Sequence, residues 1–128
     1  MTSMSVLRIP QPQAEEQLAK RIEGGRELMG LIFSIVHREV DPPDSWPFTS
    51  FEERDDLVNR AARWHAFNRT WIEVNLGGQA SEEYRRDLTF DWITDPTRWG
   101  QVKLLEHMSE AIQKETSKLE SIHDRLSI

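Results

Sequence analysis

The feature that most restricts the fold of this chain is the interval at which its apolar residues recur. They return every three or four positions along most of the sequence, and no segment of useful length alternates with a period of two. Spacing of three and four gathers side chains on one side of an α-helix, whereas alternation would gather them on one face of a strand. The pattern therefore predicts an all-α fold without strands. The clearest row lies toward the C-terminus and contains Leu105, Met108, Ile112, Leu119, Ile122 and Leu126.

The first predicted helix runs from about residue 13 to Val40. It follows residues 1–12, which hold two prolines and no periodicity and which we expect to form a flexible arm. Three apolar residues, Leu28, Leu31 and Ile35, widen the apolar face of this helix. Its main row is Leu18, Ile22, Met29, Ile32 and Val36, with Gly25 filling the gap.

Helix-ending and helix-starting signals then divide the rest of the chain. Prolines 42, 43 and 47 end the first helix, because each restricts the residue before it. Ser50 followed by Glu53 has the capping-box pattern, so a second helix begins there. The pair Gly77-Gly78 predicts that this helix ends in a left-handed cap.

Two more helices are predicted after the glycine pair. The third is short, begins near Ser81, and has the row Tyr84, Leu88, Trp92. Asp95 and Pro96 have the residue types that cap and open the fourth helix. We therefore expect residues 13–128 to form one four-helix, bundle-like domain with three long helices and one short helix.

Composition excludes several classes of function. A chain of 128 residues is long enough for one domain with a core. It has 22 acidic and 16 basic residues and a net charge of -6, without a basic block, so general nucleic-acid binding is disfavoured. The absence of cysteine excludes disulfides, thiolate metal ligands and a cysteine nucleophile. No signal peptide or membrane-spanning apolar run is recognisable, and we expect a cytoplasmic protein without membrane contact.

Two glycines inside the first helix need an explanation. Gly24 and Gly25 cost a helix interior about 2 kcal/mol relative to alanine. Close approach of another helix, or a kink, is the favoured explanation. The alternative is a ligand that touches the bare backbone.

The tryptophans form a second group of candidates. Trp64 and Trp71 are one heptad apart, so they share a helix face. Without surrounding basic residues, a packed core or a partner surface is favoured over stacking on a base. Trp46 lies in the proline-rich segment and either covers one end of the bundle or is an exposed docking point.

Polar residues interrupt two otherwise apolar rows. Asn68 lies between Trp64 and Trp71, and Glu115 interrupts the row of the last helix. Burying an amide without a partner costs about 1–3 kcal/mol, and a carboxylate costs more. We therefore hypothesise that Asn68 donates a hydrogen bond to Glu115, within one chain or across a dimer, and that the pair fixes the register. Alternatively both residues reach solvent, or Asn68 is the polar anchor of a ligand pocket among the tryptophans.

Catalytic and metal patterns are sparse. Glu120 and His123 form one Glu-x-x-His pair, whereas di-iron bundles need two copies and two further carboxylates, so we expect no metal. Arg60 and His65 have the Arg-x4-6-His spacing that resembles the signature of HEPN ribonucleases, which implies metal-independent RNA cleavage by these two residues. Five residues rotate a continuous helix by roughly 140°, however, so the two side chains should diverge.

The order of segments is similar to that of a known kind of module. "LAKRIEGGRELMG", "RAARWHAFNRTWIEVNLGG", "SEEYRRDLTF" and "GQVKLLEHMSEAIQKETSKLESIHDRL" follow one another between about residues 14 and 126. This resembles the helical module at the N-termini of many prokaryotic anti-phage and signalling proteins, ahead of TIR-like or other effector domains. The resemblance implies an adaptor or association role without catalytic residues.

Taken together, these patterns favour a non-enzymatic interaction module with no cofactor. Its expected partners are other copies of the chain, as in a dimer, a larger protein, or both. A HEPN-like ribonuclease and a small-ligand sensor stay open as alternatives. The candidate interface residues are Trp46, Trp64, Asn68, Trp71 and Glu115.

Overall fold

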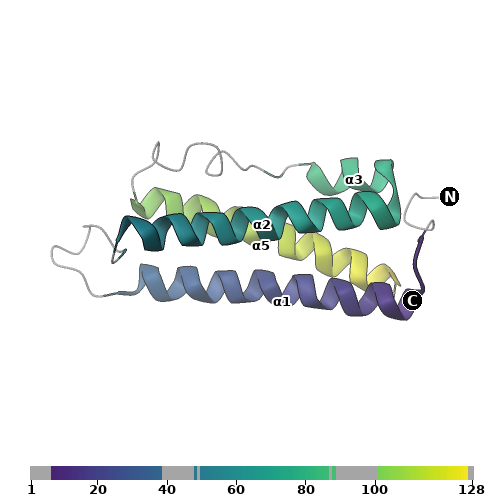
Figure 1. Ribbon diagram of the computed structural model, residues 1–128, viewed down its shortest axis with the longest axis horizontal. Helices are drawn as coiled ribbons and strands as arrows, with labels where there is room; N and C mark the ends of the chain where they lie inside the picture. Colours follow the sequence, from purple (N-terminus) through teal and green to yellow (C-terminus); the bar gives the residue numbers. More distant parts are fainter. Residues whose placement is uncertain (1–6, 39–47, 49, 87, 89–100, 127–128) are drawn as a thin grey trace.

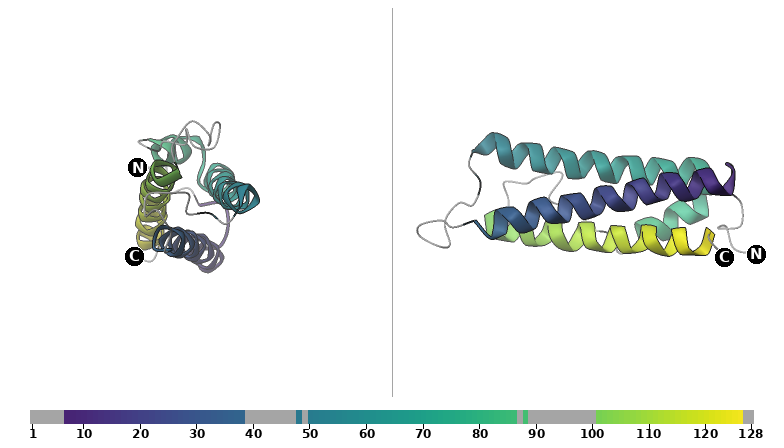
Figure 2. Two further views of the ribbon diagram at one scale, coloured as in Figure 1. Left: turned by 90° about the vertical axis from the view of Figure 1, so that its left-hand side faces the viewer. Right: turned by 90° about the horizontal axis from the view of Figure 1, so that it is seen from below.

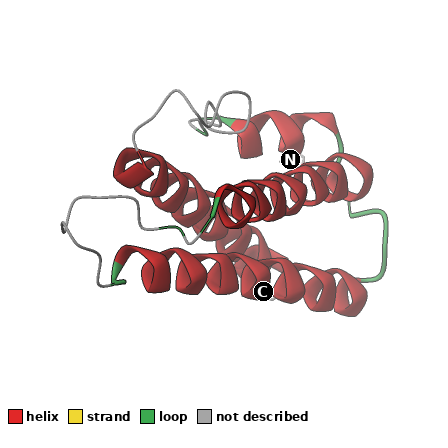
Figure 3. Cartoon of the chain, turned by 60° about the vertical axis from the view of Figure 1, so that its left-hand side comes forward, coloured by secondary structure: helices red, strands yellow, loops and turns green. Residues whose placement is uncertain are grey.

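The computed structural model describes residues 7–38, 48, 50–86, 88 and 101–126. Within these residues every regular element is a helix, as Figure 3 shows, so the predicted all-α class and the three-long, one-short arrangement are confirmed. The elements are α1 (Gln11–Val36), α2 (Phe51–Leu76), α3 (Gly78–Arg85) and α5 (Gln101–Leu126).

The three long helices lie side by side with their axes roughly aligned (Figure 1). α1 runs in the direction opposite to α2 and α5, and α3 lies beside the end of α2 (Figures 1 and 2). The end-on view in Figure 2 places α1, α2 and α5 around a common centre. An arrangement of this kind buries one stripe of each helix and leaves the opposite stripe exposed.

The row predicted for the last helix lies in the core. From Leu105 to Ile122 its members are buried, Glu115 included, and Leu126 is partly buried against the core. In α2, Trp64 and Asn68 are buried as well. The next buried position after Asn68 is Ile72 rather than Trp71, which is half-buried. Trp71 therefore lies at the edge of the core.

The buried stripe of α1 differs from the predicted row by one residue in its second half. Leu28 and Ile35 are buried, whereas Met29 is half-buried and Val36 is exposed. A stripe through Leu28 and Ile35 and a stripe through Met29 and Val36 both have a spacing of three or four, so periodicity alone does not distinguish them. Packing against α2 on one flank and α5 on the other decides which stripe is covered. Leu28 and Ile35, which the sequence placed beside the main row, are thus core residues.

The N-terminal cap of α2 is the one that the sequence predicted. Ser50 Oγ accepts a hydrogen bond from the Glu53 backbone N–H at 3.1 Å, which confirms the cap. Gly77 follows α2 with φ 94° and ψ 175°. Its φ is positive as predicted, but ψ is extended rather than left-handed helical, so the chain turns directly into α3 at Gly78 and not near Ser81.

α3 is shorter than the predicted third helix. It ends at Arg85, so Leu88 lies outside it. Lys118 Nζ donates to the backbone carbonyls of Glu83 and Arg86, at 3.2 and 2.5 Å. A cation on the last carbonyls stabilises a helix end, and this contact from α5 supplies it here.

The predicted arm is attached to the bundle over part of its length. The Arg8 backbone N–H donates to Asn75 O at 3.0 Å, and Arg8 Nη1 donates to Val74 O at 3.1 Å. These contacts give two orphan carbonyls at the end of α2 a partner. α1 already begins at Gln11, two residues before the predicted start, and it ends at Val36 rather than at Val40. The first helix therefore takes in residues 11 and 12, which the sequence assigned to the arm.

Several predicted features lie outside the described residues. They are the proline-rich segment with Trp46, the end of the predicted third row at Trp92, and the predicted cap at Asp95 and Pro96. On the described side of the proline-rich segment, Arg38 and Glu53 join the end of α1 to the start of α2. Their two hydrogen bonds include Arg38 Nη2 to Glu53 Oε2 at 2.9 Å. None of the helices in the described ranges is long and apolar enough to cross a bilayer.

Candidate functional site

The centre of the bundle holds a polar cluster around the Glu115 carboxylate. Asn68 Nδ2 donates to Glu115 Oε2 at 2.8 Å, and the Tyr84 hydroxyl donates to the same oxygen. His65 Nδ1 lies 2.7 Å from Glu115 Oε1. The cluster therefore connects α2, α3 and α5, and it confirms the predicted Asn68–Glu115 hydrogen bond within one chain.

Burial makes this cluster energetically important. Asn68 and Glu115 have no exposed surface, and Tyr84 is nearly as buried. Burial, together with the adjacent Glu115 carboxylate, raises the pKa of Tyr84 far above its ordinary value. A buried carboxylate with three hydrogen-bond partners holds its surroundings in one arrangement, because any rearrangement leaves a buried polar group unpaired. Among the described residues, Asn68 Oδ1 and Ser81 Oγ are buried without a hydrogen-bond partner.

The two glycines of α1 are explained by Trp64. The Trp64 indole Nε1 donates to the backbone carbonyl of Arg21 at 2.8 Å, and its ring covers both glycines. A Cβ atom on Gly25 would lie 2.3 Å from Thr116 Oγ1 and 2.7 Å from the Trp64 ring. This confirms close approach of the helices. Side chains of α2 and α5 occupy the space beside the glycines that was the alternative position for a ligand.

The structure does not bring Arg60 and His65 together. Both residues lie on the continuous helix α2, where Arg60 is exposed and His65 contacts Glu115. The ribonuclease hypothesis requires both side chains at one phosphate. The rotation expected from the sequence therefore holds, and the two residues lie on different sides of α2.

The ligand-sensor hypothesis meets a similar difficulty. Asn68 is enclosed in the core and not at the wall of a pocket, and Trp64 packs on α1. Trp71 does line a surface groove, with its Nε1 donating to Gln17 Oε1 at 2.5 Å. The two tryptophans and Asn68 thus do not surround one cavity.

The first of two surface grooves lies between α1 and α2 and has a volume of about 530 Å³. We call it the α1/α2 groove. Phe67 and Val74 line it and are exposed, and the Arg21 guanidinium lies 5.5 Å from the centre of the Phe67 ring. Its charged lining residues are Lys20 and Arg21, both basic.

The second groove lies between α1 and α5 and has a volume of about 570 Å³. We call it the α1/α5 groove. Phe33 and Val36 line it and are exposed, and the Phe33 ring stacks on His37 with 4.0 Å between ring centres. Its lining carboxylates are those of Glu106 and Glu110, and among the residues that the structure describes no lysine or arginine lines it.

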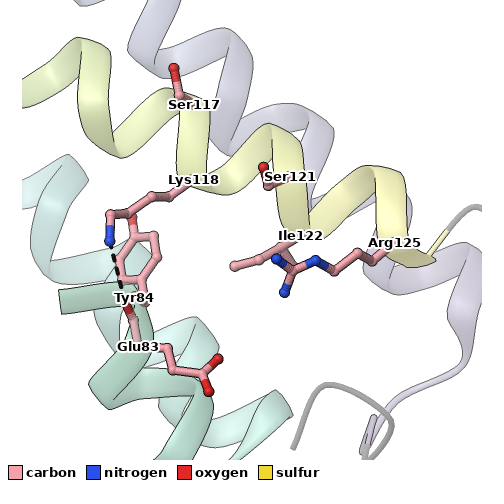
Figure 4. A pocket seen from close by; sticks show the side chains of 7 residues that line it. All are labelled: Glu83, Tyr84, Ser117, Lys118, Ser121, Ile122 and Arg125. Carbon is pink, nitrogen blue, oxygen red and sulfur yellow. Dashed lines mark hydrogen bonds between the residues drawn. The ribbon is translucent and has the colours of Figure 1, made fainter. Parts of the chain in front are cut away.

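A smaller pocket of about 260 Å³ lies between α3 and α5 (Figure 4). Figure 4 shows Lys118 extending to α3, while Arg125 lies at the other side of the pocket. The Lys118 ammonium group in this pocket already caps the end of α3, so its position has a structural explanation. Within the described residues, no group of three or more histidines and carboxylates could hold a metal ion, and Glu120 instead pairs with Arg26 at 3.7 Å.

Comparison with known proteins gives no relative: no family model, curated protein or solved structure matches this chain.

Among the groove residues, the sequence singles out Phe67 and Val74 as apolar positions outside the Trp64–Trp71 row, but it does not single out Phe33, Glu106 or Glu110. Phe33 lies outside every predicted row. The available signal for Phe33 was its position off the predicted apolar stripe of the first helix, since a large aromatic residue there is uncommon. Which charges surround each aromatic side chain depends on the neighbouring helix, and no single-helix pattern contains that information.

Proposed function

We propose that this chain is a non-enzymatic protein–protein interaction module that associates with further copies of itself. One observation carries the proposal. Of the five large hydrophobic residues that are exposed in the described part of the chain, four line the two surface grooves. Their exposed fractions are 63% for Phe33, 50% for Val36, 63% for Phe67 and 55% for Val74.

The gathering of these residues is what makes them informative. Single apolar residues scattered over a surface are ordinary, whereas apolar residues collected in a groove with a polar rim are typical of binding surfaces. Exposed aromatic side chains are also the residues that contribute most when an interface forms. The buried cluster around Glu115 supports the same proposal, because it holds the helices rigidly and so presents the grooves ready-formed.

The setting of such a module is part of the proposal. The segment order that resembles adaptor modules of prokaryotic defence proteins favours a role in assembling a signalling or anti-phage complex. These helices would then bring together several copies of a larger protein that carries an effector domain. Genes beside the coding sequence would identify that protein, and a defence cluster is the expected neighbourhood.

The direct test is the mass of the purified protein in solution. Multi-angle light scattering over a range of micromolar concentrations should give an average mass above the 15.0 kDa of one chain. The mass should rise with concentration, as it does for a reversible assembly. A mass that stays at one chain over the whole range would contradict self-association.

A matched control separates the grooves from the rest of the surface. Phe51 is 65% exposed but does not line either groove. Phe51→Gln should therefore leave the concentration dependence unchanged, whereas Phe67→Gln should shift it to higher concentration. Equal effects of the two substitutions would mean that general surface hydrophobicity, and not the grooves, drives the assembly.

A further inference from the structure

The two grooves have opposite charge and share no residue. Lys20 and Arg21 border the apolar floor of the α1/α2 groove, and Glu106 and Glu110 border that of the α1/α5 groove. One groove uses the N-terminal half of α1 and the other uses its C-terminal half. α2 and α5 lie on different sides of α1 (Figure 2). Because one groove is shared with α2 and the other with α5, the two grooves lie on different flanks of α1.

We infer that the α1/α2 groove of one copy binds the α1/α5 groove of the next copy, in a head-to-tail assembly. This inference rests on the proposed self-association and adds its geometry. In this arrangement Phe67 and Val74 of one copy lie against Phe33 and Val36 of the next. The basic rim of one groove then meets the acidic rim of the other.

Charge distinguishes this arrangement from a symmetric dimer. If two identical grooves met, Lys20 and Arg21 would face the same pair in the partner, or Glu106 and Glu110 would face themselves. Like charges brought together in an interface oppose binding, whereas complementary charges speed encounter and set orientation. The exposed pair between Lys20 and Glu16, at 3.8 Å, is too open to solvent to cancel the basic rim.

A head-to-tail contact leaves one groove unused at each end of the assembly. Such heterologous contacts build a ring where the rotation closes and an open filament where it does not. The chain would therefore form either a closed ring or an open series of sizes, and not a symmetric dimer. An adaptor of this kind could gather many copies of an attached effector domain.

Two substituted proteins test the inference by complementation. In the first, Phe67→Gln and Val74→Gln disable the α1/α2 groove. In the second, Phe33→Gln and Val36→Gln disable the α1/α5 groove. Each alone should associate at least about tenfold more weakly than the unsubstituted protein, as expected when aromatic anchors leave an interface. An equimolar mixture should form a 1:1 heterodimer and nothing larger, because one intact groove of each kind remains.

The possible results separate the inference from the proposed function. A heterodimer in the mixture supports head-to-tail binding. If the unsubstituted protein assembles but the mixture yields no heterodimer, head-to-tail binding is wrong and self-association by another surface stands. If the unsubstituted protein is monomeric throughout, both are wrong. All four positions are at least half exposed, and circular dichroism of each protein checks that the helices are intact.

Charge reversal provides a second test with different residues. Lys20→Glu with Arg21→Glu should weaken assembly, and so should Glu106→Lys with Glu110→Lys. All four reversals in one chain should restore assembly to within about tenfold of the unsubstituted protein, since each rim again meets its opposite. If the fourfold reversal is as weak as either pair, the rims do not meet and the inference is wrong.

Discussion

Asn68 Nδ2 donates a hydrogen bond to Glu115 Oε2 at 2.8 Å, and neither side chain has any exposed surface. Both residues interrupt apolar rows in the sequence, and the fold brings the two interruptions together. The Tyr84 hydroxyl and His65 Nδ1 complete the surroundings of the carboxylate. The hydrogen bond thus joins α2 to α5 at the level where α3 also contacts them.

The first prediction concerns the coupling between these two residues. Asn68→Leu should destabilise the fold by about 1–2 kcal/mol, because it removes one of the donors to a buried carboxylate. Glu115→Leu should cost about 3 kcal/mol, because it leaves several buried donors without an acceptor. The double substitution should be less destabilising than the sum, by about 1 kcal/mol or more, in urea unfolding.

An exposed asparagine of the same helix is the control for that cycle. Asn59→Leu should change the free energy of unfolding by no more than about 0.5 kcal/mol. Strictly additive effects of Asn68→Leu and Glu115→Leu would show that the two side chains are not coupled.

The second prediction compares two glycines of α1. Gly25→Ala should lower the free energy of unfolding by about 1–3 kcal/mol, because its Cβ would overlap Thr116 and Trp64. Gly30→Ala should raise it by about 0.5–1 kcal/mol, because a Cβ there meets nothing within 4 Å and alanine favours a helix. Thermal or urea unfolding of both proteins measures the difference. A stabilising Gly25→Ala would mean that the helices do not approach as closely as the structure shows.

The third prediction follows from the raised pKa of Tyr84. The unfolded chain releases a tyrosine proton near pH 10, whereas folded Tyr84 keeps it because of burial and the nearby Glu115 carboxylate. Above about pH 10 the unfolded state therefore binds fewer protons, and stability falls by about 1.4 kcal/mol per pH unit from this group. Below that pH the group contributes no such slope.

Tyr84 is the one tyrosine of the sequence, so absorbance of the phenolate reports on it alone. The absorbance should change only when the protein unfolds, and Tyr84→Phe should make the alkaline loss of stability less steep. Ionisation of the tyrosine in the folded protein near pH 10 would contradict the buried position of its hydroxyl.

The fourth prediction concerns the ribonuclease alternative. Arg60 is exposed on α2, whereas His65 contacts Glu115 in the bundle, so the pair is not arranged to act on one phosphate. Purified protein should leave single-stranded RNA as intact as buffer does, and Arg60→Ala should be indistinguishable from it on a gel. RNA fragments produced by the unsubstituted protein and lost in Arg60→Ala would restore the HEPN-like hypothesis.

The spacing of apolar residues was sufficient to predict the helices, the α2 cap at Ser50 and the row of α5. These features depend on neighbours within four residues, where local sterics and hydrogen bonds decide the outcome. Asn68 and Glu115 could also be found, because a polar residue in a long apolar row is visible without a structure. The cost of burying each one alone then suggested that they meet.

Other features needed the packing of one helix on another. Periodicity permits both Leu28 and Met29 in the core of α1, and only the positions of α2 and α5 select Leu28. The Tyr84 hydroxyl donates to Glu115, and Lys118 caps the end of α3. Both hydrogen bonds link residues more than thirty positions apart in the sequence. The grooves likewise combine an aromatic side chain of one helix with charges of another. Local pattern determines what each helix is, whereas the crossing of the helices determines which surfaces are covered and which remain to bind a partner.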